Sequence, residues 1–312
     1  NNKNFFPYVL SELHGGLGNL LFQYAAGLSI SRKLKSRLVF FNLQEGSIEW
    51  LESYLGKNLD IATSTELVLL GNSKRVKNKN FKTIIRIFNK LNLRLGPIYF
   101  GGMMMPLEKK IISKSRFALN LNGYYQHQSF YGDVKNEILE MLAKQIYGLD
   151  FKKTKLQNRT LIHIRRGDYL HHPGWTINKE YYLNVLKKYD PERLDPVCIV
   201  SNEDLAVDAF ENYCIKLGYK ITKLPHLKDN KEIQNKNISG NFISNATRDF
   251  LAISQSKRVI MSNTTFAWWG VSLGDFIFGN SVKETIYPKG WLPNMPDTLK
   301  QDHWISENTN IN

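Results

Sequence analysis

The 312-residue sequence is poor in cysteine and has no long apolar run. Its two cysteines are Cys198, inside an apolar run at 197–200, and Cys214, in a predicted helix. These positions favour two buried thiols over a disulfide, which fits a reducing compartment weakly. No apolar run reaches the roughly 18 residues that span a bilayer, and the amino terminus has no signal-peptide pattern. The first residue is Asn1 and not Met, so earlier removal of a leader or anchor stays open.

Acidic residues are also scarce, because 28 Asp and Glu face 42 Lys and Arg and give a net charge of +14. Most of the excess lies at 72–118, where Glu108 is the single acid among twelve basic residues. Apolar residues at helical spacing from 81 to 91 predict a basic amphipathic helix. It is either a solvated surface helix or a peripheral contact with an anionic membrane surface or glycolipid. We expect no nucleic-acid partner, because no recognised binding motif accompanies the charge.

Strand and helix patterns alternate along the chain and predict an α/β fold. The expected strands are 8–13, 37–41, 161–164, 197–201, 219–224 and 258–261. The expected helices are 20–35, 133–146, 179–188, 205–217, 245–255 and 267–273. A polar, lysine-rich stretch at 149–157 separates a loosely patterned first half from a regular second half. It predicts an N-terminal domain of residues 1–155 and a C-terminal domain of residues 156–312.

The predicted strand 161–164 ends in a cluster of charge, Arg165-Arg166-Gly167-Asp168. In open α/β sheets, ligands bind beyond the carboxyl ends of the strands. Adjacent guanidiniums repel each other, so each needs an acidic partner or an anion, and the arginine fork suits phosphate. The pair therefore indicates either an anion site or two surface ion bridges, and the anion site is favoured.

Other predicted strand ends carry polar or glycine-rich residues. Gly15, Gly16 and Gly18 precede a helix, so their backbone can approach an anion, although a tight turn alone explains them. Asn19 is placed to cap this helix and to bond a substrate. The segments 202–204 and 262–266 give further polar strand ends, the second of which is either an anion site or a simple helix cap. The segment 123–131, rich in aromatic and amide residues, is either a sugar contact or a strand that leads into a helix.

Three of these motifs together resemble the signatures of the α-1,2-fucosyltransferase family, glycosyltransferase family 11. They are the glycine turn with Phe22-Gln23-Tyr24-Ala25, the block His163-x-Arg165-Arg166-Gly167-Asp168-Tyr169, and the stretch from Asp249 to Gly270. The segment 287–291 resembles the closing segment of the family, and the matches follow its order from residue 14 to residue 291. One departure is Leu20, where the family usually has Gln.

The resemblance implies a GT-B fold, with two Rossmann-like domains facing each other across a cleft. It also implies inverting transfer of L-fucose from GDP-fucose to O2 of a β-galactoside, without a metal or other cofactor. In keeping with this, the sequence has no Asp-x-Asp motif. Arg165 is then expected at the diphosphate as the principal catalytic group, and Asn19 near the reacting sugar. The expected donor-binding residues are Gly16, Gly18, His163, Arg166, Asp249, Ser262, Asn263, Thr264, Thr265 and Phe266.

The general base and the compartment stay open. Asp168 either accepts the acceptor proton or orients the arginines, and His14, His171 and His172 are alternatives because imidazole accepts a proton near neutral pH. Late proton loss without a strong base is a further alternative. Four glycosylation sequons suit a luminal ectodomain, but one lies at Asn263, inside the expected donor site. We expect a cytoplasmic enzyme at the inner membrane face, with a membrane-anchored luminal enzyme as the alternative.

Overall fold

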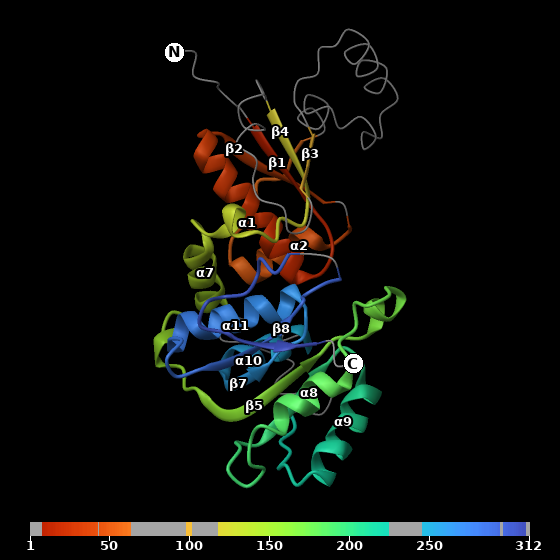
Figure 1. Ribbon diagram of the computed structural model, residues 1–312. Coiled ribbons are helices and arrows are strands. Elements are labelled where there is room, and N and C mark those ends of the chain that lie inside the picture. Colours follow the sequence, from red (N-terminus) through yellow and green to blue (C-terminus); the bar gives the residue numbers. More distant parts are fainter. Residues whose placement is uncertain are drawn as a thin grey trace. The chain divides into compact units, whose positions relative to one another are not determined.

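The computed structural model describes residues 8–42, 44–63, 98–101, 118–224, 245–293 and 296–309. The chain forms two compact units, residues 1–138 and 139–312, whose elements are labelled in Figure 1. The division falls inside helix α7 (Lys135–Tyr147), ahead of the boundary that the sequence predicts between residues 155 and 156. The predicted basic helix at 81–91 and most of the basic segment 72–118 lie outside the described residues.

The first unit is built on a parallel sheet with the strand order β2-β1-β4-β3. Its strands are β1 (Tyr8–Leu13), β2 (Arg37–Asn42), β3 (Ile98–Gly101) and β4 (Ala118–Gly123). Its helices are α1 (Leu17–Leu34), α2 (Ser47–Leu55) and α6 (Gln128–Tyr131). Helix α1 buries Ala26 and Ile30 against Val9 of β1 and Leu119 and Leu121 of β4. This packing fixes the glycine turn, which joins β1 to α1, at the carboxyl end of the sheet.

The second unit is built on a parallel sheet with the strand order β6-β5-β7-β8-β9. Its strands are β5 (Gln157–Ile164), β6 (Val197–Ser201), β7 (Ser256–Ile260), β8 (Glu284–Lys289) and β9 (Ile305–Asn308). Its helices are α8 (Lys179–Leu186), α9 (Asp204–Lys216), α10 (Asn245–Gln255) and α11 (Thr265–Phe278), with short 3-10 helices η2 (Phe151–Lys153) and η3 (Gly167–His171). Because the strands are parallel, the loops that follow β5, β6 and β7 emerge at one edge of the sheet.

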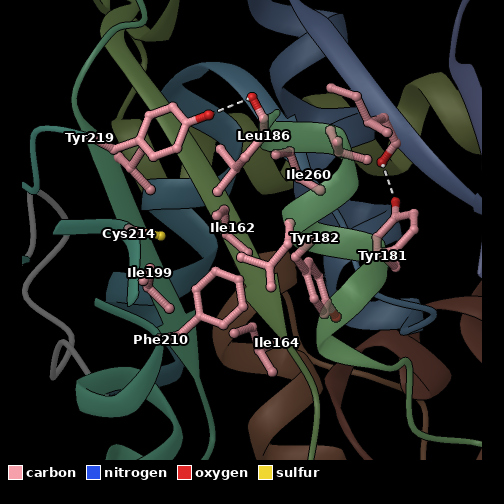
Figure 2. Close-up of a cluster of buried hydrophobic side chains, with 14 of the residues drawn as sticks. Ile162, Ile164, Tyr181, Tyr182, Leu186, Ile199, Phe210, Cys214, Tyr219 and Ile260 are labelled. Carbon is pink, nitrogen blue, oxygen red and sulfur yellow. Dashed lines mark hydrogen bonds between the residues drawn. The ribbon is translucent and has the colours of Figure 1, made fainter. Parts of the chain in front are cut away.

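The core of the second unit lies between this sheet and helices α8 and α9 (Figure 2). Ile162 of β5 is fully buried there, and the phenol rings of Tyr181 and Tyr219 enter the same cluster. Both hydroxyls find backbone acceptors: Tyr219 donates to the Leu186 carbonyl at 2.7 Å, and Tyr181 to the Met261 carbonyl at 3.3 Å. Both tyrosine hydroxyls are thus paired, and the cluster packs against β5 directly before the loop that this strand carries.

The structure confirms the α/β class and most of the predicted elements, but it corrects one strand. Residues 219–224 form no strand, and only an isolated bridge joins Ile221 to Val197. Backbone bonds run from Val197 N to Lys220 O and from Thr222 N to Val197 O, and the pairing goes no further. A segment of strand-like composition does not extend a sheet unless its backbone stays paired with a neighbouring strand, because strand propensity depends on its surroundings.

Cys198 and Cys214 are free and buried, as the sequence predicts. Burial raises the pKa of the Cys198 thiol to about 11 and that of Cys214 to about 12. Both are therefore neutral, unreactive core residues. Within the described part of the chain, no helix is both long enough and apolar enough to cross a bilayer.

Candidate active site

Arg165 directly follows β5, and its guanidinium is held on two sides. Its Nη2 donates to Asp168 Oδ1 at 2.6 Å, and its guanidinium carbon lies 5.3 Å from the centre of the Tyr169 ring. Its side chain is 32% exposed, yet its Nε is buried and has no acceptor among the described residues. A buried guanidinium donor without an acceptor costs free energy unless an anion or a ligand oxygen meets it.

Arg166 points to a different partner, because its Nε donates to Glu203 Oε2 at 2.7 Å. Its backbone N–H donates to Asn202 Oδ1 at 3.0 Å, so the polar strand end after β6 braces the loop after β5. Gly167 then turns the chain with φ of +58°, and a Cβ at this position would overlap the Asn202 side chain. Arg166 thus has the structural ion pair that the sequence left as an alternative, and its expected role at the donor stays a prediction.

Asp168 accepts a hydrogen bond from Arg165, as a carboxylate that orients the guanidinium would. Its side chain is 62% exposed, so its other oxygen is open to solvent contact. Of the two roles that the sequence leaves open, orientation of the arginine is the one with a contact in the structure. His171 lies in η3 and His172 follows it, and the His172 ring contacts Trp175 at 4.5 Å between centroids.

His163 lies at the end of β5 and is buried against the loop that follows β7. Its Nδ1 is 2.6 Å from Ser262 Oγ, and its ring stacks near Phe266 at 6.2 Å between centroids. Burial lowers the pKa of His163 to about 3, and the Arg165 charge acts in the same direction. The imidazole is therefore neutral at physiological pH and offers a hydrogen bond without a charge.

The loop after β7 leads into α11 through three polar residues. Asn263 is only 3% exposed, and its Nδ2 donates to the carbonyls of Trp175 and Trp291, both at 2.8 Å. Thr264 caps α11, because its Oγ1 accepts from Ala267 N at 3.1 Å. Thr265 begins the helix. The helix cap that the sequence left as an alternative for this loop is present at Thr264, while contacts of the loop with a donor stay predictions.

Asp249 lies in α10, where Arg248 Nη2 is 2.7 Å from its Oδ1. Both side chains are largely buried, at 21% exposed for Arg248 and 15% for Asp249. The expected contact of Asp249 with the donor stays a prediction.

In the first unit, the glycine turn lies at the carboxyl end of β1. Gln23 holds it from α1, because its Oε1 accepts from His14 N at 2.9 Å and its Nε2 donates to His14 O at 3.1 Å. The helix begins with Gly16 as its N-cap and has no side-chain cap, so the expectation that Asn19 caps it is wrong. Asn19 lies one turn further on, and its Oδ1 accepts from Gln126 Nε2 at 3.2 Å. Gly18 is buried, whereas no described atom would meet a Cβ at Gly16.

The described residues include no group of three or more His, Cys, Asp or Glu side chains that could hold a metal ion. The independence from metals that the resemblance implies is a separate matter, and it stays a prediction.

The sequence model for glycosyl transferase family 11 matches residues 9–287 and so spans both strand-end clusters. The chain belongs to glycosyl transferase family 11. Two curated relatives from Escherichia coli match most of its length. The O-antigen biosynthesis glycosyltransferase WbnK is 25% identical over 96% of this chain and 100% of its own. An alpha-1,2-colitosyltransferase is 26% identical over 89% of this chain and 91% of its own.

Solved structures also resemble this family 11 glycosyltransferase, although distantly. POFUT1 in complex with GDP-fucose aligns with 89% of this chain and 96% of its own, at 12% identity and a TM-score of 0.45.

Two residues that the sequence left without a role belong to the same cluster. Tyr169 lies against the Arg165 guanidinium, and its hydroxyl donates to the Asn263 carbonyl at 3.2 Å. The Trp175 ring meets Tyr169 edge-on at 5.3 Å. Tyr169 could have been singled out because it directly follows Asp168, whereas Trp175 carries no comparable signal in the sequence.

Proposed function

We propose that this family 11 glycosyltransferase transfers L-fucose from GDP-fucose to O2 of a terminal β-galactoside, with inversion at the anomeric carbon. The observation that carries the proposal is Arg165, which lies at the carboxyl end of a central parallel strand with a buried Nε that no described residue pairs. An arginine there suits the diphosphate of a nucleotide sugar, because ligands bind beyond such strand ends. The chain also has two α/β units, each with a parallel sheet, as a GT-B enzyme does, and this supports the proposal.

In the proposed reaction, the acceptor hydroxyl oxygen attacks the anomeric carbon of fucose as the bond to the GDP oxygen breaks. GDP leaves with the bonding electron pair, and the hydroxyl proton passes to a base or to water. Negative charge grows on the diphosphate, so a fixed guanidinium stabilises the transition state more than the ground state. Arg165 Nε and Nη2 form one edge of the guanidinium fork, and Nη2 is shared with Asp168.

His163 would meet the donor as a neutral hydrogen-bonding group, because its pKa lies far below physiological pH. The amino end of α11 lies at the same edge of the sheet, and its partial positive charge favours phosphate. We further propose that transfer needs no metal and takes place in the cytoplasm, at the inner membrane face.

One relative gives a specific reason to consider a second donor. The alpha-1,2-colitosyltransferase is 26% identical over 91% of its own length. Colitose differs from L-fucose in lacking one ring hydroxyl, so the proposed contacts of Arg165 with a donor diphosphate would apply equally to a colitose donor. A GDP-linked dideoxyhexose is therefore the alternative donor, with the same roles for Arg165 and its neighbours.

The test is transfer from labelled GDP-fucose and GDP-colitose to a panel of β-galactosides, after EDTA treatment, with linkage assigned by NMR. We expect a product with the sugar on O2 of galactose, and a loss of roughly 100-fold or more in Arg165→Ala. Arg193→Ala is the matched control, since Arg193 is an exposed arginine of the same unit that is paired with Asp190. Transfer to another hydroxyl would replace the linkage, and near-normal turnover in Arg165→Ala would overturn the role of this arginine.

A further inference from the structure

The loop that carries Arg165 is held from both neighbouring strands. In the sheet, β5 lies between β6 and β7. Asn202, which follows β6, accepts a hydrogen bond from the Arg166 backbone. Asn263, which follows β7, lies on the other side and contacts the loop through its own backbone carbonyl. Each flanking strand thus contributes one asparagine to this loop.

The orientation of the Asn263 amide is fixed by its partners. Its Nδ2 lies 2.8 Å from two backbone carbonyl oxygens, those of Trp175 and Trp291. Carbonyl oxygens only accept, so the nitrogen and not the oxygen must face them, and both of its N–H groups are used. Asn263 is only 3% exposed and has no amide N–H left for a phosphate, whereas its buried Oδ1 has no hydrogen-bond partner among the described residues.

Tyr169 connects Asn263 to Arg165. Its hydroxyl donates to the Asn263 carbonyl at 3.2 Å, which sets the position of the ring. The ring in turn lies 5.3 Å from the Arg165 guanidinium carbon, within the range of a cation–π interaction. Asn263 also donates to the backbone carbonyl of Trp175, and the Trp175 ring packs edge-on against the Tyr169 ring. These contacts run without a break from the loop after β7 to the guanidinium.

We propose that Asn263 and Tyr169 are positioning residues, which act by holding the Arg165 guanidinium in place. The inference rests on the proposed role of Arg165 at the diphosphate. An arginine side chain has many rotamers, and a group that stabilises a transition state must be held before the reaction begins. Tyr169 and Asp168 restrict the guanidinium from two directions, and Asn263 fixes Tyr169.

The first experiment compares Tyr169→Phe, which keeps the ring, with Tyr169→Leu, which removes it. We expect kcat to fall roughly 3- to 10-fold in Tyr169→Phe and further in Tyr169→Leu, as for the loss of one hydrogen bond and then of the ring. The KM for the acceptor and the melting temperature should change little. Tyr213→Phe is the matched control, because Tyr213 is an exposed tyrosine of α9. Unchanged kcat in Tyr169→Leu would overturn the proposal.

The deciding experiment is a double-mutant cycle with Arg165→Ala, read out by kcat and by GDP affinity in calorimetry. If Tyr169 acts through Arg165, Tyr169→Phe has no further effect once Arg165 is gone. The same fold-loss in both backgrounds would overturn the positioning role while the proposed function stands. If Arg165→Ala changes neither GDP affinity nor transfer, the role of Arg165 itself fails, and the positioning proposal fails with it.

Chemical rescue of turnover distinguishes a positioning role of Tyr169 from a role in stability alone. Guanidinium ion at millimolar concentration should restore part of the turnover of Arg165→Ala, because it can occupy the place of the missing group against the Tyr169 ring. The rescue should be absent in the Arg165→Ala, Tyr169→Leu double variant. Equal rescue in both variants would overturn the proposal.

Discussion

Asn202 Oδ1 accepts a hydrogen bond from the backbone N–H of Arg166 at 3.0 Å, so the strand end after β6 braces the loop after β5. Gly167 packs directly beside this amide, with φ of +58°. The turn therefore needs glycine twice, once for its backbone conformation and once for the space that Asn202 occupies. The geometry of the arginine loop depends on a residue that lies far away in the sequence.

Gly167→Ala should lower both stability and transfer. An alanine in the left-handed region costs roughly 1–2 kcal/mol, and its Cβ would push Asn202 away from Arg166. The free energy of unfolding and kcat measure the two effects. Gly218→Ala is the control, since Gly218 has φ of +86° in the same unit and its added Cβ would meet only Pro191 at 3.8 Å. It should lose stability and keep kcat, and equal kcat in the two variants would count against the bracing role.

Gly16→Ala should leave the fold intact and reduce transfer. Gly16 has φ of −75°, and no described atom would meet a Cβ there. Since neither the backbone conformation nor the space demands glycine here, its remaining roles are the N-cap of α1 and close approach of a substrate to the backbone. Alanine is a poorer N-cap than glycine, so the free energy of unfolding should fall by roughly 1 kcal/mol, whereas kcat/KM should fall further than this loss explains. Unchanged kcat/KM would remove Gly16 from the expected donor-binding set.

Gly27→Ala, in the same helix α1, should mainly lower stability. Its Cβ would meet Leu38 Cδ1 at 2.9 Å and Ser11 Cβ at 3.2 Å, so it overpacks the contact of α1 with the sheet. We expect a loss of roughly 1–3 kcal/mol in the free energy of unfolding.

His163 should make the enzyme less stable in mild acid. Burial lowers its pKa to about 3 in the folded protein from the 6.5 of an exposed imidazole, so the unfolded chain binds the proton first. This contribution is fully present above pH 6.5 and is lost as the pH falls from 6.5 towards 3, by about 1.4 kcal/mol for each pH unit. Denaturant unfolding between pH 4.5 and 7 measures it. His163→Gln should show a shallower dependence, and an unchanged slope would contradict the burial of a neutral imidazole.

The two thiols should report unfolding of the second unit. Cys198 and Cys214 are buried, and their pKa values of about 11 and about 12 leave little thiolate at pH 8. Iodoacetamide should therefore label neither residue until denaturant opens the core. Rapid labelling of Cys198 in buffer alone would contradict the position of β6 in the sheet.

Long, regular elements were predictable from the sequence. Strand 197–201 and helix 245–255 match the structure at both ends, because apolar periodicity and burial agree there. The failures are local. Residues 219–224 have strand composition, but only one of them forms a bridge. Asn19 has a side chain that can cap a helix, but Gly16, three residues earlier, is already the N-cap of α1.

The sequence predicts which residue types lie at the site and at which strand ends, but not which hydrogen-bond partner each side-chain atom has. Polar residues after β5 and β7 could be expected to share one edge because parallel strands end together. That Asn263 uses both amide hydrogens follows from the carbonyls of Trp175 and Trp291, which come from separate loops. Residue type gives the hydrogen-bonding capacity of a side chain, but only the fold determines which partners use it.

The position of β5 between β6 and β7 also orders events during synthesis. Arg165 precedes Asn263 and Trp291 in the sequence, so the arginine loop is synthesised before the residues that hold it. A nascent chain that holds β5 and β6 alone has Tyr169 without its acceptor at Asn263. The contacts that hold the arginine loop are therefore completed only after the segment that carries Asn263 has been synthesised.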